Sequence, residues 1–461
     1  MIRRPIFFLS LVLILLLTGA CSSLPDILGY IDDFPNSGGD LTVVGSKGRM
    51  GPEESEAALA LQRPREDPRS GLSRNLAVIE SLGGSPVFAG NRVTLLNDGD
   101  ATFQAMLTAI ANARDHVNLE TYIIDDDDVG RRFADLLIEK RAEGVTVNLI
   151  YDRLGSRRTP RSFFERLKKG GVNIVEFNPL NPLRLPAHEV LLHRTHRKML
   201  IVDGRSAFVG GVNIGSAYLR RRIPGEGEAV PSQLWRDTHL MVEGPAVTAF
   251  QELFFRTWTR QNAPLPGTGH YFPEMHETGD QMVQVVASTR GPESRICYMM
   301  YVSAIVHAQR SVHLTQSYFA PDKQMMRALK DAARRGVDVK IVLPEYSDHS
   351  IVRHAGRWHY QELLDAGVKL YERSGVVLHA KTAVIDGSWS TIGSTNLELW
   401  SLVTNDEVNA VVIGPAFAEE MEASFQGDLL ESKEVLTGEW QHRPLLERAR
   451  QFFAHLFEYW L

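Results

Sequence analysis

Cysteine is scarce in this sequence. The 461 residues include only two cysteines, Cys21 and Cys297, and two cysteines cannot supply a disulfide framework. Cys297 falls within a helical pattern of apolar residues, so we expect it to be a buried core residue. The fold must therefore be stabilised by packing of apolar residues, and the pattern of apolar and polar residues predicts its elements.

A large excess of charge is also missing. Lys and Arg number 50 and Asp and Glu number 56, which gives a net charge of −6. This balance argues against a protein built mainly to hold nucleic acid, although a local basic groove stays compatible with it. The chain is 44% hydrophobic and 23% charged, which is typical of a globular protein. Its length suits two domains or two fused halves.

The N-terminal apolar run is too short for a comfortable membrane span. It extends from Ile6 to Leu17, whereas a spanning helix needs about 20 residues. Two arginines precede it, and small residues separate it from Cys21, as in a bacterial lipoprotein signal whose cysteine carries lipid. We therefore expect residues 1–21 to be a signal peptide, Cys21 to be lipidated, and the protein to lie on a periplasmic or other extracytoplasmic membrane face. An ordinary signal peptide and an uncleaved anchor are the alternatives.

The segments at the two ends of the remaining chain differ from its centre. Residues 22–80 show little sustained periodicity and are predicted to be a tether, with a short helix possible around Glu54–Gln62. Residues 441–461 are predicted to form an amphipathic helix. Docking on the core and contact with a membrane interface are both compatible with its apolar face, which consists of Leu445, Leu446, Ala449, Phe452, Phe453, Leu456, Phe457, Trp460 and Leu461.

The chain contains two copies of one motif. The matching residues are His196 and His379, Lys198 and Lys381, Asp203 and Asp386, Gly210 and Gly393, and Asn213 and Asn396. Their separation is constant, since 379−196 and 396−213 both equal 183. Chance would rarely supply two copies that agree at so many positions, so the repeat indicates a duplicated unit.

A second match follows each copy of the motif. Asp237 and Gly244 pair with Glu407 and Gly414, because 407−237 and 414−244 both equal 170. An acidic residue therefore begins a strand in each half, and Gly-Pro precedes a helix. The shorter offset places a 13-residue insertion (183−170) in the first half. Its arginines, Arg220–Arg222, would either attract phosphate head groups at an anionic membrane or belong to a solvated loop.

The remaining periodicity predicts the same order of elements in both halves. Strands near 91–96, 117–123, 145–151 and 172–177 alternate with helices, and strands near 282–286, 312–319, 337–343 and 367–371 repeat the order. This order implies parallel strands with crossover helices. We expect an α/β fold with one lobe over residues 81–275 and another over 276–440. Asn178–Leu192 is extra in the first half and is interpreted as an irregular connection, with a lip or membrane-facing loop as the alternative.

The repeated motif carries the chemistry. On a strand, residues two positions apart point to the same face, so the imidazole and ammonium of each His-x-Lys project side by side. Two such pairs brought together would form a cationic pocket suited to a phosphodiester. One imidazole would attack phosphorus and the other would act as acid and base. The candidate phosphate-binding residues are Asn213, Asn396, Gly211 and Ser394.

An imidazole nucleophile also needs a group that orients its second nitrogen. Asp237 and Glu407, one in each half, are the candidates. The inventory contains no obvious set of metal ligands, so neither a metal nor another cofactor is expected.

With these residues in place, the sequence resembles the phospholipase D superfamily. The stretches HRTHRKMLIVDGRSAFVGGVNIGSAY and LHAKTAVIDGSWSTIGSTNLE look most like bacterial cardiolipin synthases. The resemblance implies two pseudo-symmetric lobes, each a mixed sheet flanked by helices, with one active site between them. It also implies metal-independent phosphatidyl transfer through phosphohistidine, with His196 as nucleophile and His379 as acid and base. Asp203 and Asp386 complete the catalytic motifs, although their place at a strand-end turn agrees with a structural role.

The resemblance leaves the acceptor open. The leading hypothesis is transfer of a phosphatidyl group to a glycerol-bearing lipid head group, as in cardiolipin synthesis. Hydrolysis of phospholipids to phosphatidic acid shares the first half-reaction, and a nuclease of the same superfamily is less favoured. The expected partners are phospholipids and a membrane surface reached through an N-terminal anchor, and no nucleic acid is expected. Many bacterial cardiolipin synthases begin with two transmembrane helices, which this chain replaces with a lipoprotein-like signal.

Overall fold

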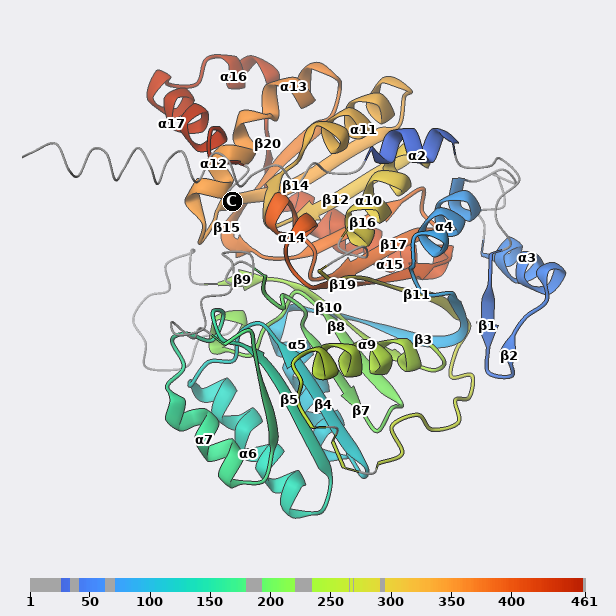
Figure 1. The fold of residues 1–461 in the computed structure, drawn as a ribbon. Helices are drawn as coiled ribbons and strands as arrows, with labels where there is room; N and C mark the ends of the chain where they lie inside the picture. Colours follow the sequence, from blue (N-terminus) through green and yellow to red (C-terminus); the bar gives the residue numbers. More distant parts are fainter. Residues whose placement is uncertain are drawn as a thin grey trace, which may run out of the picture.

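The protein consists of two α/β lobes (Figure 1). The computed structural model describes residues 26–33, 41–62, 71–179, 193–219, 234–264, 266–267, 269–290 and 295–458. The predicted signal peptide, Cys21, most of Asn178–Leu192 and the arginines Arg220–Arg222 lie outside the described residues.

Lobe 1 is built on a mixed sheet with the strand order β3-β10-β8-β7-β4-β5-β6. Its strands are β3 (Val87–Asn97), β4 (His116–Thr121), β5 (Thr146–Asp152), β6 (Asn173–Phe177), β7 (Met199–Val202), β8 (Ser206–Gly210) and β10 (Thr238–Glu243). The predicted parallel pairing is confirmed for β4, β5 and β6. β3 instead lies at the opposite edge, because the β7–β8 hairpin and β10 come between it and β4.

Lobe 2 repeats this order as β11-β19-β17-β16-β12-β14-β15. Its strands are β11 (Gln281–Ser288), β12 (Ser311–Gln316), β14 (Asp338–Tyr346), β15 (Lys369–Leu378), β16 (Lys381–Ile385), β17 (Trp389–Gly393) and β19 (Glu407–Ile413). β20 (Ser432–Glu434) and the lobe 1 strand β9 (Trp235–Arg236) pair with β15. β13 (Phe319–Ala320) and β18 (Leu397–Glu398) form a separate pair.

Helices cover both faces of each sheet. In lobe 1 these are α5 (Asp98–Ala111), α6 (Asp128–Ala142), α7 (Arg161–Lys169), α9 (Val247–Arg260) and the 3₁₀ turn η1 (Ser216–Tyr218). In lobe 2 they are α10 (Ile296–His307), α11 (Lys323–Arg334), α12 (Ser350–Trp358), α13 (Tyr360–Asp365), α14 (Leu399–Val403), α15 (Pro415–Leu430), α16 (Thr437–Gln441) and α17 (Leu445–His455). Gly244 and Gly414, which precede α9 and α15, have φ of 115° and 127°, so these sharp turns favour glycine.

The two lobes share a core. Their first strands, β3 and β11, pair antiparallel and join the sheets edge to edge. One apolar cluster between the sheets includes Phe250 of α9 and Phe417 of α15. Separate clusters fill the outer side of each lobe. Since burial of apolar surface is the main stabilising term in folding, the shared cluster fixes how the lobes face each other.

The predicted tether is wrong for the described parts of residues 22–80. α2 (Ile27–Asp33) buries Ile27 and Ile31 in the core of lobe 2, and α4 (Gly71–Ser81) packs against α10. β1 (Val43–Gly45) pairs with β2 (Gly48–Arg49) and β3, and α3 (Pro52–Leu61) covers the expected short helix. The segment is polar and contains glycine, so its short apolar faces give little periodic signal in the sequence. They are buried only because they pack against the folded lobe.

No helix within the described ranges has both the length and the apolar character needed to cross a bilayer. Cys297 lies in α10 and is fully buried, which confirms the prediction of a core residue. Burial raises the pKa of its thiol to about 11.

Candidate active site

Each motif begins just before a buried strand and ends at a tight turn. His196 precedes β7 and His379 precedes β16. Asp203 and Asp386 follow these strands with φ of 52° and 53°, a left-handed conformation that aspartate tolerates better than most residues. The histidines and the aspartates of the motifs therefore lie at opposite ends of the same strands.

The two motif aspartates bind backbone amides rather than the histidines. Asp203 accepts hydrogen bonds from the N–H groups of Arg114, Asp115 and His116, at 2.8–2.9 Å. Asp386 accepts them from the equivalent loop of lobe 2, Gln309–Ser311. Each carboxylate fixes the loop that leads into the strand paired with its own motif strand. The geometry supports the structural role and not a place among the reacting groups.

Replacing Asp203 with alanine is expected to lower the free energy of unfolding by about 3 kcal/mol, because three backbone donors lose a charged acceptor. Urea denaturation followed by circular dichroism measures this change. Asp203→Asn, which retains one acceptor oxygen and tolerance of the positive φ, should lose less. Wild-type stability in Asp203→Ala together with lost activity would instead assign the carboxylate to the chemistry.

Backbone contacts between the lobes hold the two motif histidines at the lobe interface. The backbone N–H of His196 donates to the carbonyl oxygen of Asp406 at 2.9 Å. The N–H of His379 donates to the carbonyl oxygen of Arg236 at 2.8 Å. β9 of lobe 1 continues this contact as a parallel pair with β15 of lobe 2. The segment before each histidine thus lies beside the segment before the other lobe's acidic residue.

This arrangement pairs each imidazole with a carboxylate from the other lobe. His196 Nδ1 lies 2.9 Å from Glu407 Oε1, and His379 Nδ1 lies 2.7 Å from Asp237 Oδ2. Since a carboxylate accepts, we assign the N–H to Nδ1 in both rings, which leaves Nε2 with a free lone pair. All four side chains are buried. The sequence pointed to both acids, and the structure shows that the pairs cross between the lobes.

Burial sets the charge state of the histidines and lysines. Burial lowers the pKa of His196, and burial together with the neighbouring Lys381 lowers the pKa of His379 well below its usual value. Burial lowers the pKa of Lys381 to about 8 and that of Lys198 well below its usual range. Each ammonium donates to the carbonyl oxygen of the histidine two residues earlier. Both imidazoles are therefore neutral in the resting site at neutral pH.

The two asparagines lie in matching positions. Asn213 accepts from the N–H of Ile123 at 3.1 Å and donates to the hydroxyl of Tyr218. Asn396 accepts from the Ser317 hydroxyl at 2.7 Å. These contacts tie each amide to the chain that follows β4 or β12, which is the strand beside its own motif strand.

Gly211 and Ser394, which are predicted to bind phosphate, lie against the two acidic residues. A Cβ at Gly211 would stand 2.1 Å from Asp237 Oδ1, so glycine leaves the space that this carboxylate occupies. Ser394 Oγ donates to the second oxygen of Glu407. Both residues position the carboxylates that hold the histidines.

Aromatic side chains surround the two histidines. Tyr122 packs edge-on to His196 with ring centroids 5.1 Å apart, and Tyr318 does the same to His379 at 6.2 Å. Trp235 and Tyr218 also contact His379. None of these aromatic residues is predicted from the sequence. A signal was present, because a tyrosine follows the motif-paired strand in each half: Tyr122 comes one position after β4 and Tyr318 two positions after β12.

The arrangement is suited to a reaction at a phosphodiester. Two imidazoles with free Nε2 lone pairs, each held by a carboxylate, can serve as nucleophile and as acid and base. Two amides and two ammonium groups can stabilise negative charge on phosphoryl oxygens. Within the described part of the chain, the one cluster of three possible metal ligands is His359, His455 and Glu458, which belongs to neither motif.

Comparison with known proteins matches both motif-bearing halves of the chain to one family. A family model described as "Cardiolipin synthase, PLD-like domain" matches residues 106–223 and 301–429, one match in each half. The chain is 35% identical to the cardiolipin synthase of Geobacillus sp. (strain WCH70), covering 83% of this chain and 74% of that protein. It is 37% identical to cardiolipin synthase A of Pseudomonas aeruginosa (strain LESB58), covering 78% and 71%.

Among solved structures, phosphatidylserine synthase of Haemophilus influenzae Rd KW20 matches with a TM-score of 0.58. The match covers 80% of this chain and 95% of that chain, at 11% sequence identity. At this identity the likeness concerns the fold, and it supports the predicted two-lobed α/β architecture.

Proposed function

The chain belongs to the cardiolipin synthase family of phospholipase D-like proteins, and from that membership we propose that it is a phosphatidyltransferase that makes cardiolipin. The donor is a phospholipid, and the acceptor is the glycerol hydroxyl of a second lipid head group. The observation that carries the proposal is the pair of buried imidazoles, each held at Nδ1 by a carboxylate of the opposite lobe.

In the first half-reaction, Nε2 of His196 attacks the phosphorus of the donor. A P–N bond forms, the P–O bond to the donor head group breaks, and His379 gives a proton to the departing alkoxide. The resting imidazoles are neutral because of burial. The negative charge of the bound phosphodiester favours protonation of His379, which supplies that proton.

In the second half-reaction, the acceptor hydroxyl gives its proton to His379. The acceptor oxygen attacks phosphorus, the P–N bond breaks, and His196 is restored. Lys198, Lys381, Asn213 and Asn396 stabilise the charge on the phosphoryl oxygens during both transfers. Water in place of the acceptor lipid would give phosphatidic acid, so exclusion of water determines whether the enzyme transfers or hydrolyses.

The test is incubation of the purified protein with phosphatidylglycerol, with and without phosphatidylethanolamine, followed by lipid mass spectrometry. Cardiolipin should appear with the wild type and vanish in His196→Ala and His379→Ala. Phosphatidic acid as the sole product would replace the proposal with a phospholipase D. Nuclease activity lost in the same variants, without lipid turnover, would overturn both.

We also propose that the protein is held at an extracytoplasmic membrane face by lipid on Cys21. Supporting this are the arginines, the short apolar run and the small residues that precede the cysteine. α2 begins at Ile27 and is docked on lobe 2. The intervening chain can reach at most about 20 Å, so such an anchor would keep the lobes close to the bilayer.

Cys21→Ser is expected to abolish labelling of the protein by a palmitate analogue in cells, because the lipidated thioether and amino group are lost together. The labelled protein is detected after gel separation. Cys297→Ser is the matched control and should label like the wild type, since that thiol is buried. Unchanged labelling of Cys21→Ser would rule out this anchor.

A further inference from the structure

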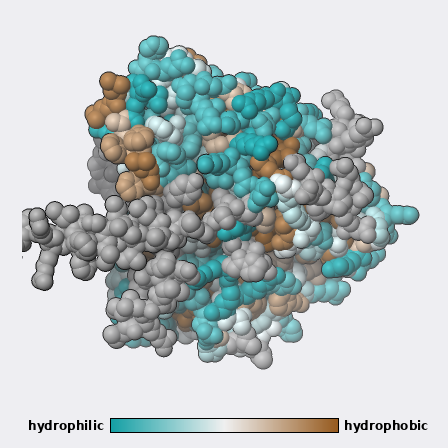
Figure 2. Space-filling view, turned by 45° about the horizontal axis from the view of Figure 1, so that its top comes forward, coloured by the Kyte–Doolittle hydropathy of each residue, from teal (hydrophilic) through white to brown (hydrophobic). Residues whose placement is uncertain are grey.

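The C-terminal helix α17 is oriented with its apolar face toward solvent. Six large apolar side chains of residues 445–457 are exposed, with fractional exposures of 78% for Leu445, 64% for Leu446, 43% for Phe452, 62% for Phe453, 54% for Leu456 and 49% for Phe457. Figure 2 shows the resulting hydrophobic patch at the upper left, over the end of lobe 2 where α17 lies. A surface helix of a globular protein normally buries this face.

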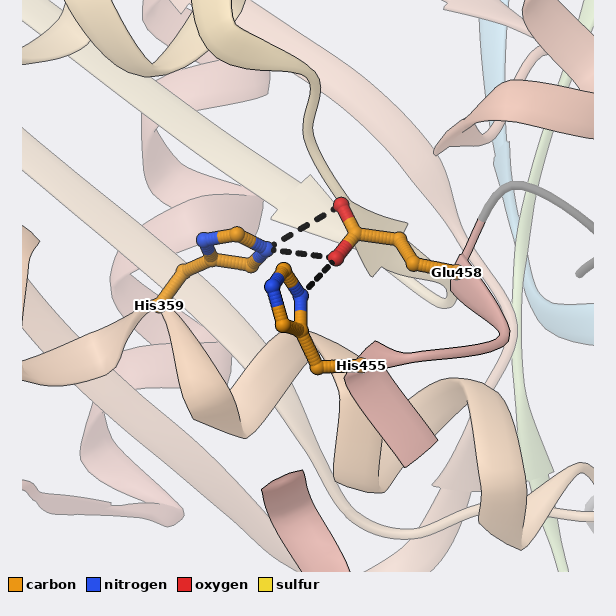
Figure 3. Close-up of side chains that lie close together, drawn as sticks. All are labelled: His359, His455 and Glu458. Atoms are coloured by element: carbon orange, nitrogen blue, oxygen red, sulfur yellow. Dashed lines mark hydrogen bonds and ion pairs between the residues drawn. The ribbon is translucent and has the colours of Figure 1, made fainter. Parts of the chain in front are cut away.

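The inward side of α17 carries polar groups that make specific contacts, beside the buried Ala454. Gln451 is fully buried, and Glu447 lies 3.6 Å from the guanidinium of Arg357 on α12. Beyond the helix, Glu458 accepts from His359 Nε2 at 2.9 Å and from His455 Nδ1 at 2.5 Å (Figure 3). Breaking these buried polar contacts to turn the helix over would leave unpaired groups in the interior. The outward apolar face is therefore fixed by the fold.

α17 is connected to the candidate active site through β13 and α12. Ala454 of α17 packs with Ala355 of α12 and Ala320 of β13. Two residues before Ala320 is Tyr318, which contacts His379. The hydroxyl of Tyr318 donates to Asp348, just before α12. A short path of packed side chains thus connects the helix with the histidine.

We propose that the exposed face of α17 is a docking surface for an anionic phospholipid bilayer. The six apolar side chains would enter the interface between head groups and acyl chains. Arg448 and Arg450 are exposed on the same helix, whereas its acidic residue, Glu447, is paired inward. The exposed charges of the helix are thus basic in a chain of net charge −6, which complements anionic head groups.

The docking surface would bring the active site to its lipid. This consequence depends on the proposed function, whereas docking itself depends only on the surface. α17 would seat lobe 2 on the bilayer, so that a phospholipid reaches His379 without leaving the membrane surface.

The test places an environment-sensitive fluorophore at Phe453→Cys in the full chain carrying Cys21→Ser, so that lipid on Cys21 cannot contribute. Vesicles of phosphatidylglycerol should raise and blue-shift its emission by at least about twofold in intensity, because the probe enters the apolar interface. Vesicles of phosphatidylcholine should do so less. The same probe at Leu430→Cys, a site that is 88% exposed on α15, should not respond.

Binding variants complete the test. Phe452→Ser with Phe453→Ser should weaken vesicle binding on the order of 30-fold, because two half-exposed phenylalanines no longer enter the interface. Leu61→Ser with Leu430→Ser removes two apolar residues elsewhere that are even more exposed and should leave binding unchanged. Arg448→Glu with Arg450→Glu should abolish the preference for phosphatidylglycerol.

Three results would overturn the proposal. The first is a silent probe at position 453 with anionic vesicles, and the second is an equal response at position 430. The third is a fluorescence response without vesicles that rises with protein concentration, together with a dimer in analytical ultracentrifugation. That result would assign the face to a second copy of the chain. Loss of cardiolipin formation alone would contradict the proposed function and leave the docking proposal standing, because the probe and binding measurements do not depend on turnover.

Discussion

Replacing His196 with alanine is expected to lower phosphatidyl transfer by at least about a thousandfold, because the covalent route needs an imidazole nitrogen at phosphorus. The fold should survive, since the change removes a polar ring and not an apolar core residue. The direct measurement is an acid-labile phospholipid adduct on the protein, trapped with a labelled donor. The wild type should form it and His196→Ala should not.

His379→Ala separates the two roles. If His196 is the nucleophile, His379→Ala still forms the adduct slowly when the donor carries a good leaving group, because such a group needs no proton. His276→Ala, at an exposed histidine outside both motifs, is the matched control and should retain activity. An adduct that persists in His196→Ala and disappears in His379→Ala would reverse the assignment.

The duplicated unit could be predicted from the sequence because its signals are local. Strands and helices follow from periodicity, and the constant offset of 183 identifies equivalent residues without any three-dimensional information. The identical strand order of the two sheets is the structural counterpart of that offset. The second offset identified Asp237 and Glu407, which the structure places against the histidines.

The pairing between lobes could not be predicted, because it depends on contacts between residues 211 and 142 positions apart in the chain. Nothing local to Glu407 shows that its partner is His196 rather than His379. Ser394 is a different case, because its hydroxyl donates to Glu407, which is only 13 residues away in the same lobe. The dependence on distant contacts also explains why the packing of the N-terminal segment could not be predicted. Its short apolar faces are buried only beside α10 and α11.

The crossed pairs make the site a joint product of both lobes. Each lobe supplies a histidine and the carboxylate that orients the other lobe's histidine. A change in the relative placement of the lobes would therefore separate both pairs at once. The antiparallel β3–β11 contact and the shared core limit such movement, which keeps the imidazoles in fixed positions for both half-reactions.

The crossing predicts different consequences for the two carboxylates. Glu407→Gln should impair the nucleophile, and Asp237→Asn should impair the acid and base, each lowering turnover by roughly 10²- to 10⁴-fold because the imidazole loses its orientation and tautomer. Substrate affinity should change little. Each variant is nearly isosteric, so stability measured by urea denaturation separates a positioning role from a merely structural one.

The leaving group of the donor distinguishes the two variants. A phosphodiester with an activated phenolate leaving group removes the need for the acid, so adduct formation should recover in Asp237→Asn and stay slow in Glu407→Gln. In Glu407→Gln the neutral amide can present its N–H to Nδ1 and force the N–H onto Nε2, which blocks attack. Pairing within each lobe would give the opposite pattern, with recovery in Glu407→Gln. That result would show that the contacts between His196 and Glu407 and between His379 and Asp237 do not govern the reaction.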